Sequence, residues 1–263
     1  MAFVLLREAR MAGPEQVIAA FRSVAPNGPT LEVDLSEADD VALPDGGAAV
    51  GGLQLEANTF RLDKDDVLHV MLMPIAIPNN EAEGNASLSP SGWNRDDPFP
   101  PYSAHLAVVY KPAAGRTQIQ GLQHLTFALA ALAEANGAVG VYWKGVTHRT
   151  AYFVDMARTV EKPVPLWVGV GIARDGSDRI SMLSFGMEEF GLPNLRLTAP
   201  ASAGAGAGLI GDFFDMLVYV IDRGTPIPAG DSVGRTADER IPVRYEPSPV
   251  HPDTQVWRVD LER

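Results

Sequence analysis

Residues 105–143 read HLAVVYKPAAGRTQIQGLQHLTFALAALAEANGAVGVYW, and this stretch decides the fold class. Its apolar beginning predicts a β-strand. The middle predicts a helix, because leucines recur at helical spacing between Thr117, a good capping residue, and Gly137, a helix stop. The final residues, 138–143, alternate with a period of two and predict another strand. A strand, a helix and a strand in succession indicate a sheet that is covered by helices.

The same order of elements recurs on both sides of this stretch. Before it, AFVLLRE (2–8) predicts a strand, GPEQVIAAFRSVAP (13–26) a helix, and VLHVMLMPIAI (67–77) a central strand. After it, PLWVGVGI (165–172) predicts a strand and GLIGDFFDMLVYVIDRG (208–224) the last long helix. We therefore predict an α+β fold with a mixed, mostly antiparallel sheet and helices packed on one face. The pattern also allows two related strand–helix–strand halves that share one sheet.

Residues 78–103, PNNEAEGNASLSPSGWNRDDPFPPYS, interrupt this order with five prolines and two glycines. We therefore divide the chain into an acidic N-terminal segment (1–77), a long proline-rich loop (78–103) and a C-terminal α+β domain (104–263), with the option that the first and last form one compact unit. Aromatic residues such as Trp93 argue against a plain disordered linker. Two interpretations stay open: an ordered connection packed over the sheet, or a loop that shapes a binding site.

The charge of the chain is unevenly distributed. Residues 1–100 hold sixteen acidic against six basic residues, which is −10 of a net charge of −12. Such a surface repels phosphate backbones, so we expect no nucleic-acid partner. It would attract a basic protein, although an acidic surface that only keeps the protein in solution is the plainer interpretation.

Other bulk features exclude several classes of site. The chain has no cysteine, which excludes disulfides, cysteine–metal sites and a thiol nucleophile. The five histidines lack metal-binding spacings, and no nucleophile-elbow motif is present. GAGLIG (206–211) fits the spacing of a dinucleotide-binding loop, but no predicted strand leads directly into it. We therefore expect no metal and no cofactor. With no signal peptide and no apolar run long enough to span a membrane, we expect a cytoplasmic protein.

A few residues are candidates for chemistry or binding. His148 is the most plausible acid–base group, and Glu188 and Glu189 could do acid–base work as a pair, although a solvated turn is the plainer interpretation. The candidate binding residues gather near the strand end at 142–144 and in two loops: Trp93, Tyr142, Trp143, Lys144 and Asp231. Within this set, Trp143 favours core packing and Asp231 favours a turn.

Five stretches in order resemble one family: AVGVYWKG, VPLWVGVGI, SFGMEEFGLPNLRLT, the helix that follows them, and IPAGDSVG. Together, over roughly residues 104–235, they resemble the bacterial domain-of-unknown-function family numbered 4261. The resemblance implies a fold family and no established activity. Asn194 departs from the acidic residue that family members tend to carry after the proline of the FGLP turn. By analogy with small acidic bacterial proteins, the resemblance suggests an immunity or accessory protein.

Two functional hypotheses follow. The first is a non-enzymatic protein-binding protein of the immunity or accessory type, steered to a basic partner by acids among Asp39, Asp40, Asp63, Asp65 and Asp66. The alternative is a hydrolase with a pocket near residues 142–148 and 188–189. Self-association into a homo-oligomer is a further arrangement that the sequence allows.

Overall fold

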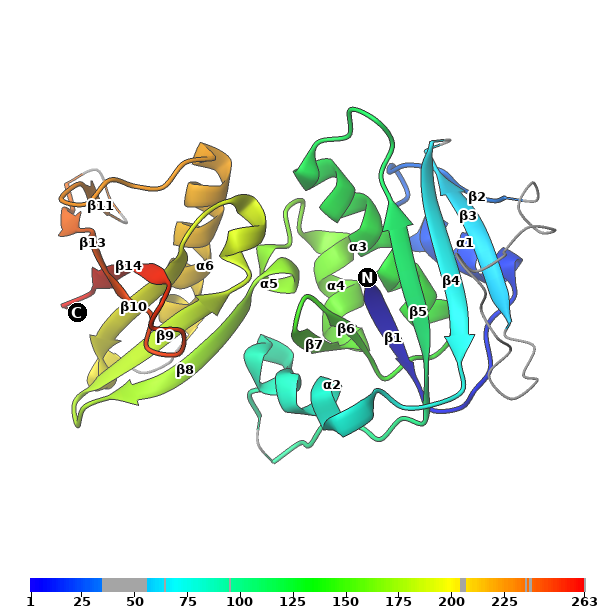
Figure 1. The fold of residues 1–263 in the computed structure, drawn as a ribbon, viewed down its shortest axis with the longest axis horizontal. Helices are drawn as coiled ribbons and strands as arrows, with labels where there is room; N and C mark the ends of the chain where they lie inside the picture. The colour runs from blue at the N-terminus through cyan, green and yellow to red at the C-terminus, as the bar shows by residue number, and fades with distance from the viewer. Residues whose placement is uncertain are drawn as a thin grey trace. The chain divides into compact units, whose positions relative to one another are not determined.

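The computed structural model describes residues 1–34, 56–63, 65–94, 96–203, 207–234, 236 and 238–262. The chain forms two compact units, residues 1–163 and 164–263 (Figure 1). Helix accounts for 34% and strand for 31% of the chain, which confirms the predicted α+β class. The boundary between the units falls after Pro163, so the proline-rich loop does not separate them.

The first unit contains a seven-stranded antiparallel sheet in the order β2-β3-β4-β5-β1-β6-β7. Its strands are β1 (Ala2–Leu6), β2 (Leu31–Val33), β3 (Ala57–Leu62), β4 (Asp66–Met73), β5 (Ala104–Lys111), β6 (Gly140–Trp143) and β7 (Val146–Arg149). The strands β5 and β6 of the stretch that decides the fold are not neighbours, because β1 lies between them and pairs with both. The beginning of the chain therefore completes the sheet that the middle of the chain starts.

Helices cover one face of this sheet, as predicted. They are α1 (Pro14–Val24), α3 (Gln118–Ala135) and α4 (Thr150–Thr159), which Figure 1 shows together on one side. Thr117 caps α3 as expected, since its side chain accepts a hydrogen bond from the Gln120 amide. Val4 and Val141 are fully buried on the helix-covered face. Their sequence neighbours therefore point to the opposite face.

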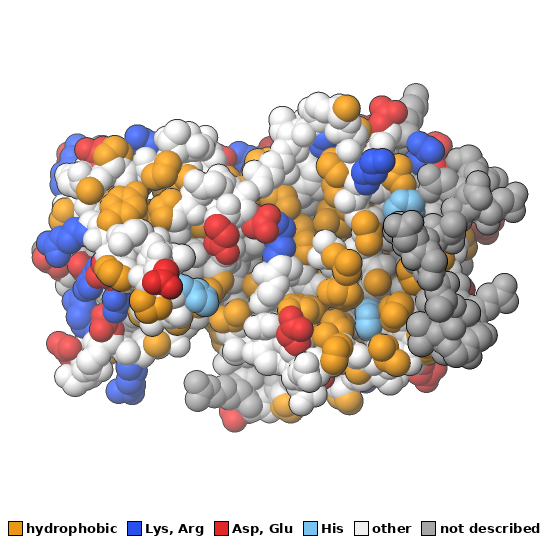
Figure 2. Space-filling view, in the orientation of Figure 1, with side chains coloured by type: hydrophobic (Ala, Val, Ile, Leu, Met, Phe, Trp, Pro, Cys, Tyr) orange, Lys and Arg blue, Asp and Glu red, His pale blue; other side chains and the backbone are white. Residues whose placement is uncertain are grey.

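The opposite face of the sheet is covered in part by the proline-rich segment. This segment folds into short helical turns: η2 (Pro78–Asn80), α2 (Glu81–Gly84), η3 (Asn85–Leu88) and η4 (Pro90–Gly92). Where it crosses Gly140, a Cβ atom would lie 2.6 Å from the Phe99 ring, so only glycine allows this approach. On the described part of this face, Figure 2 shows hydrophobic side chains gathered over β1, β4 and β5. Val109 on β5 is 44% exposed.

Arg149 at the end of β7 fastens the proline-rich segment to the sheet. Its guanidinium donates from Nε to the Ser91 carbonyl at 3.1 Å and from Nη2 to the carbonyls of Asp97 and Pro98, the latter at 2.9 Å. The same group lies 5.9 Å from the centre of the Phe99 ring. The segment is thus an ordered connection packed on the sheet, and its start, at Pro78 and Glu81, also lines a pocket.

The second unit packs a five-stranded sheet, in the order β13-β14-β10-β9-β8, against the long helix α6. Its elements are α5 (Val164–Trp167), β8 (Gly169–Asp175), β9 (Arg179–Phe185), η5 (Met187–Phe190), β10 (Asn194–Pro200), η6 (Ala201–Ala203), α6 (Ala207–Arg223), β11 (Ser232–Val233), β12 (Ile241–Pro242), β13 (Arg244–Pro247) and β14 (Gln255–Asp260). β10 and β14 run parallel and the other neighbours antiparallel, so the sheet is mixed as predicted.

The predicted strand at 165–172 is wrong in its first half. Residues Val164–Trp167 form the short helix α5, closed by a hydrogen bond of 2.9 Å from the Val168 amide to the Val164 carbonyl. Pro165 explains the difference, because proline is favoured in the first turn of a helix. The apolar alternation of this stretch was equally compatible with a buried helical turn.

Candidate functional site

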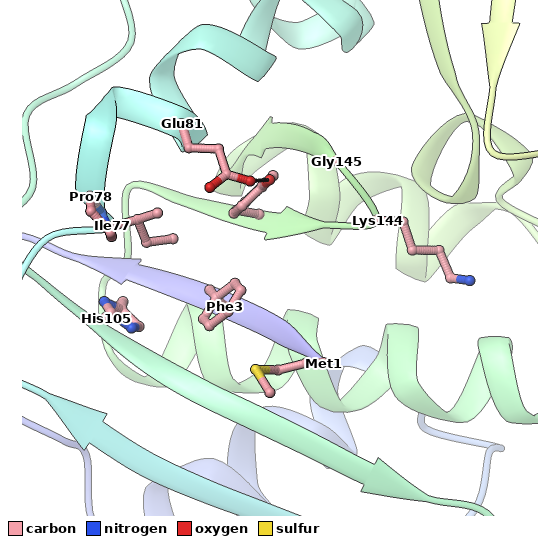
Figure 3. A pocket seen from close by; sticks show the side chains of 9 residues that line it. Met1, Phe3, Ile77, Pro78, Glu81, His105, Lys144 and Gly145 are labelled. Atoms are coloured by element: carbon pink, nitrogen blue, oxygen red, sulfur yellow. Dashed lines mark hydrogen bonds between the residues drawn. The ribbon is translucent and has the colours of Figure 1, made fainter. Parts of the chain in front are cut away.

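A pocket of about 440 Å³, here called the Tyr142 pocket, lies on the face of the first sheet opposite α1, α3 and α4 (Figure 3). It is lined by Met1, Phe3, Ile77, Pro78, Glu81, His105, Tyr142, Lys144 and Gly145. Three neighbouring strands supply its floor. Phe3 on β1 pairs directly with Tyr142 on β6, and Leu5 on β1 pairs with His105 on β5. Because cross-strand partners share a face, these side chains meet in the middle of the sheet.

Aromatic rings form the floor of the Tyr142 pocket. The rings of Phe3 and Tyr142 lie nearly parallel, with centroids 5.9 Å apart and an angle of 19° between their planes. His105 meets Phe3 edge-on, with centroids 5.3 Å apart. These contacts fix the three rings before any ligand arrives, as is typical of a preformed binding site.

Tyr142 and Glu81 form the polar wall. The Tyr142 hydroxyl donates a hydrogen bond to Oε1 of Glu81 on α2, and it accepts a longer one of 3.5 Å from the Asn85 amide group. Burial and the Glu81 carboxylate raise the pKa of Tyr142 to about 12, so its phenol stays protonated at neutral pH. Glu81 is therefore held over the aromatic floor with its remaining lone pairs available to a ligand.

His105 contributes a second acceptor. Its Nδ1 lies 2.8 Å from the Ile75 carbonyl, which can only accept, so Nδ1 carries the proton. Burial lowers the pKa of His105, and the ring is neutral at pH 7. In this tautomer Nε2 is the ring nitrogen that accepts a hydrogen bond from a ligand.

Lys144 sits in a strained turn at the rim. Lys144 and Gly145 form the two-residue connection between β6 and β7, with φ angles of 53° and 74°. Two positive φ angles identify a type I′ hairpin turn, in which asparagine followed by glycine is favoured and lysine is uncommon. The Lys144 ammonium lies 6.0 Å from the centre of the Trp143 ring.

Replacing Lys144 by Asn should stabilise the first unit by about 1 kcal/mol, because asparagine tolerates the left-handed conformation at lower energy than lysine. Equilibrium unfolding in urea measures the change. Lys111→Asn is the matched control, since Lys111 ends β5 in an extended conformation and gains nothing from the substitution. Equal or lower stability of Lys144→Asn than of the wild type would contradict the prediction.

The structure places the predicted binding residues in different surroundings. Tyr142 and Lys144 line the Tyr142 pocket. Trp143 is 2% exposed and belongs to the core, as its alternation favoured. Trp93 donates its indole N–H to the Ser87 carbonyl at 3.1 Å, a hydrogen bond within the proline-rich segment. Asp231 lies exposed after a turn of the second unit, where its carbonyl accepts a hydrogen bond from the Val243 amide.

The residues predicted for a hydrolase do not come together within either unit. His148 is fully buried in the first unit, with its Nδ1 2.8 Å from the Ser89 hydroxyl. Glu188 and Glu189 are exposed on η5 of the second unit, and Glu188 accepts a hydrogen bond of 3.2 Å from the Asn194 side chain. Asn194 thus closes a turn and carries no sign of a catalytic role.

A separate polar cluster surrounds Asp66 at the start of β4. The Asp66 carboxylate is fully buried and accepts hydrogen bonds from the Tyr110 hydroxyl at 2.6 Å, the Ala113 amide at 2.7 Å and His124 Nδ1 at 2.8 Å. Arg116 completes the cluster with an ion pair of 3.0 Å. This cluster joins β4 to the connection between β5 and α3.

The burial of Asp66 corrects one part of the steering hypothesis. Asp66 cannot act as an exposed charge that attracts a partner, and Asp63 is paired with Arg116 at 3.4 Å. Asp65 is exposed, as the hypothesis requires. Asp39 and Asp40 lie outside the described residues.

Of the nine residues that line the Tyr142 pocket, two were predicted from the sequence; those that were missed include Phe3, Glu81 and His105. No motif joins them, and only the pairing of β1 with β5 and β6 brings the two ring residues together. The alternation of AFVLL and HLAVVY did carry a partial signal, because it assigns each ring to one face of its strand.

The chain was compared with family models, curated proteins and solved structures. No family model, curated protein or solved structure matches the chain. The resemblance to the family numbered 4261 therefore stays a prediction. Among the described residues, no group of three or more His, Asp or Glu could hold a metal ion, and no helix is long and apolar enough to cross a membrane.

Proposed function

We propose that this chain is a non-enzymatic binding protein whose first unit takes a basic protein partner at the Tyr142 pocket. One observation carries the proposal: a preformed pocket with an aromatic floor, in which Tyr142 and His105 are each already oriented by a hydrogen bond within the chain. A small number of fixed polar groups in an aromatic setting is typical of recognition sites. An immunity or accessory role is one form that such a binding protein could take.

The surface around the pocket favours a protein over an isolated small molecule. Met1, Ile75 and Val109 are 75%, 56% and 44% exposed, and apolar side chains gather on this face of the sheet (Figure 2). Exposed apolar surface next to a pocket is common at protein–protein interfaces. The excess of acidic residues in the first hundred favours a basic partner, because opposite charges speed association and suppress wrong partners.

The test is a pull-down from a lysate of the organism that encodes the chain, at low and high salt. Wild type is compared with Pro78→Arg, which places a bulky cation at the exposed rim of the pocket, and with Pro26→Arg, which makes the same charge change in the exposed loop after α1. We expect wild type and Pro26→Arg to retain one basic protein at low salt, and Pro78→Arg to lose it. Retention of the same protein by Pro78→Arg would refute binding at this pocket.

The alternative function, a hydrolase, has one observation in its favour. The Ser89 hydroxyl and His148 Nδ1 lie at the distance of a nucleophile–base pair. Both side chains are fully buried, however, and the Ser89 hydroxyl already accepts a hydrogen bond of 3.2 Å from the Ser91 amide. We therefore expect Ser89→Ala and wild type to hydrolyse p-nitrophenyl acetate at the same background rate, and a loss specific to Ser89→Ala would favour the hydrolase.

A further inference from the structure

We infer that the Tyr142 pocket recognises a cation, the alkylammonium or guanidinium group of a Lys or Arg side chain on the basic partner. The inference rests on the proposed function and names the chemical group that this pocket takes. It follows from the polarity of the pocket, from the direction of its one basic side chain, and from its rings.

Apart from Lys144 at the rim, the polar side chains that line the pocket offer acceptors to a ligand. Glu81 is a carboxylate with lone pairs beyond the one that the Tyr142 hydroxyl uses, and His105 presents an unprotonated Nε2. The Tyr142 hydroxyl already donates its one hydrogen bond to Glu81, so it is not a donor for the ligand. A partner group rich in N–H donors therefore complements the pocket, and ammonium and guanidinium groups are the side chains that have donors only.

The basic side chain at the rim does not fill this position. Lys144 lines the pocket, but Figure 3 shows its ammonium pointing away from Glu81, Phe3 and His105. The ammonium lies over the Trp143 ring instead. The left-handed turn at Lys144 directs the side chain outward, so the space between Glu81 and the aromatic floor stays accessible to a cation from outside.

The rings add a second attraction for the same group. Phe3 and Tyr142 form a near-parallel pair, and Figure 3 shows Phe3 below the Glu81 side chain. The negative faces of aromatic rings attract cations within about 6 Å, and more strongly where water is excluded. A carboxylate above and aromatic rings below suit a long side chain whose stem is apolar and whose tip is charged.

The test uses defined peptides and the full chain labelled with ¹⁵N. Acetylated, amidated Gly-Lys-Gly and Gly-Arg-Gly are compared with Gly-norleucine-Gly, which keeps the apolar stem and lacks the charge. Binding is followed at the backbone amides of Phe3, Lys144 and Gly145. We expect saturable shifts with the two basic peptides and none with the norleucine peptide at the same concentrations. Equal binding of the norleucine peptide, or no binding of either basic peptide, would overturn the inference.

Matched variants assign the binding to Glu81. Glu81→Gln keeps an acceptor for the Tyr142 hydroxyl and should weaken binding of the lysine peptide about fivefold, the upper end of the usual effect of an exposed ion pair. Glu83→Gln makes the same charge change on the same short helix, but Glu83 accepts from Tyr102 at 3.2 Å and does not line the pocket, so binding should change little. Lys144→Asn should act in the opposite direction and strengthen binding about twofold, because it removes a like charge from the rim.

These outcomes separate the inference from the proposed function. Loss of the cellular partner by Pro78→Arg together with equal binding of charged and neutral peptides would leave the pocket a protein-binding site and refute its cation specificity. Unchanged capture by Pro78→Arg together with Glu81-dependent binding of the lysine peptide would support the cation specificity of the pocket. It would refute binding of the cellular partner at the pocket. n-Butylammonium chloride distinguishes the source of the cation: if it binds as tightly as the lysine peptide, the pocket takes a free organic cation and the protein side chain is the wrong source.

Discussion

Replacing Asp66 by Asn should reduce the free energy of unfolding of the first unit by about 3 kcal/mol. The carboxylate is fully buried and accepts from four groups, and removal of one partner from a buried ionic cluster leaves the others desolvated and unpaired. The largest part of the loss comes from Arg116, because an asparagine amide is neutral and cannot form an ion pair with its guanidinium. Urea unfolding at pH 7, followed by circular dichroism, measures the loss.

The effect of Asp66 should depend on pH in a defined direction. Burial alone raises the pKa of Asp66, but the hydrogen bonds from Tyr110, the Ala113 amide, His124 and Arg116 outweigh it, and the net pKa lies below the ordinary 3.8. A lowered pKa in the folded state means that the stabilisation is present above the unfolded value and is lost as the pH falls through the folded value. The stabilities of wild type and Asp66→Asn should therefore converge below pH 3.8.

Asp65→Asn provides the control, because the same change is made at an exposed neighbour. We expect a change within about 0.5 kcal/mol for this variant, as is usual for surface positions. If Asp66→Asn behaved like Asp65→Asn, the cluster would not hold β4 to the connection before α3.

Replacing Arg149 by Met should destabilise the first unit by about 2 kcal/mol and loosen the proline-rich segment. Methionine keeps the apolar contact with Phe99 but loses the hydrogen bonds of the guanidinium to three main-chain carbonyls. Hydrogen bonds to charged groups contribute about 1.5–3 kcal/mol. Hydrogen exchange read by mass spectrometry should show faster exchange over residues 85–99, while the second unit exchanges at the wild-type rate.

Arg158→Met is the control for Arg149→Met. Arg158 donates to Glu134 at 2.7 Å from a side chain that is 36% exposed, and exposed ion pairs of this kind contribute less than about 1 kcal/mol. Unchanged exchange over residues 85–99 in Arg149→Met would show that the segment is held by its other contacts, such as the bond between Ser89 and His148.

The sequence was sufficient to predict the class of the fold and most of its long elements. Thr117 and Gly137 bracket α3, the apolar run at 105–110 identified β5, and the period of two identified β6, because caps, apolar runs and alternation are local properties. The order of strands was not accessible in this way. The insertion of β1 between β5 and β6 depends on contacts between residues about a hundred or more positions apart, and no local pattern reports such pairing. The same limitation led to a domain boundary at 78–103, although β4 and β5 pair across that segment.

Some residues of the candidate site had a local signal in the sequence, and others had none. Tyr142 and Lys144 were predicted because they follow an apolar strand and precede a glycine, which marks the end of a hairpin strand. Glu81 was not predicted, because a glutamate in a proline-rich segment has no signal that separates it from a solvated charge. Asp66 was interpreted as one of several surface acids, and only the fold shows that Tyr110 and His124 enclose it.

The position of β1 also has a consequence for biosynthesis. Ala2–Leu6 leaves the ribosome before both of its hydrogen-bonding neighbours, since β5 and β6 are made about a hundred or more residues later. At roughly 5–20 residues per second, the nascent chain carries this apolar strand without its partners for several seconds. During that interval AFVLL is available to chaperones and to the strand edges of other chains. Newly made protein, more than mature protein, should therefore be the form that is prone to aggregation.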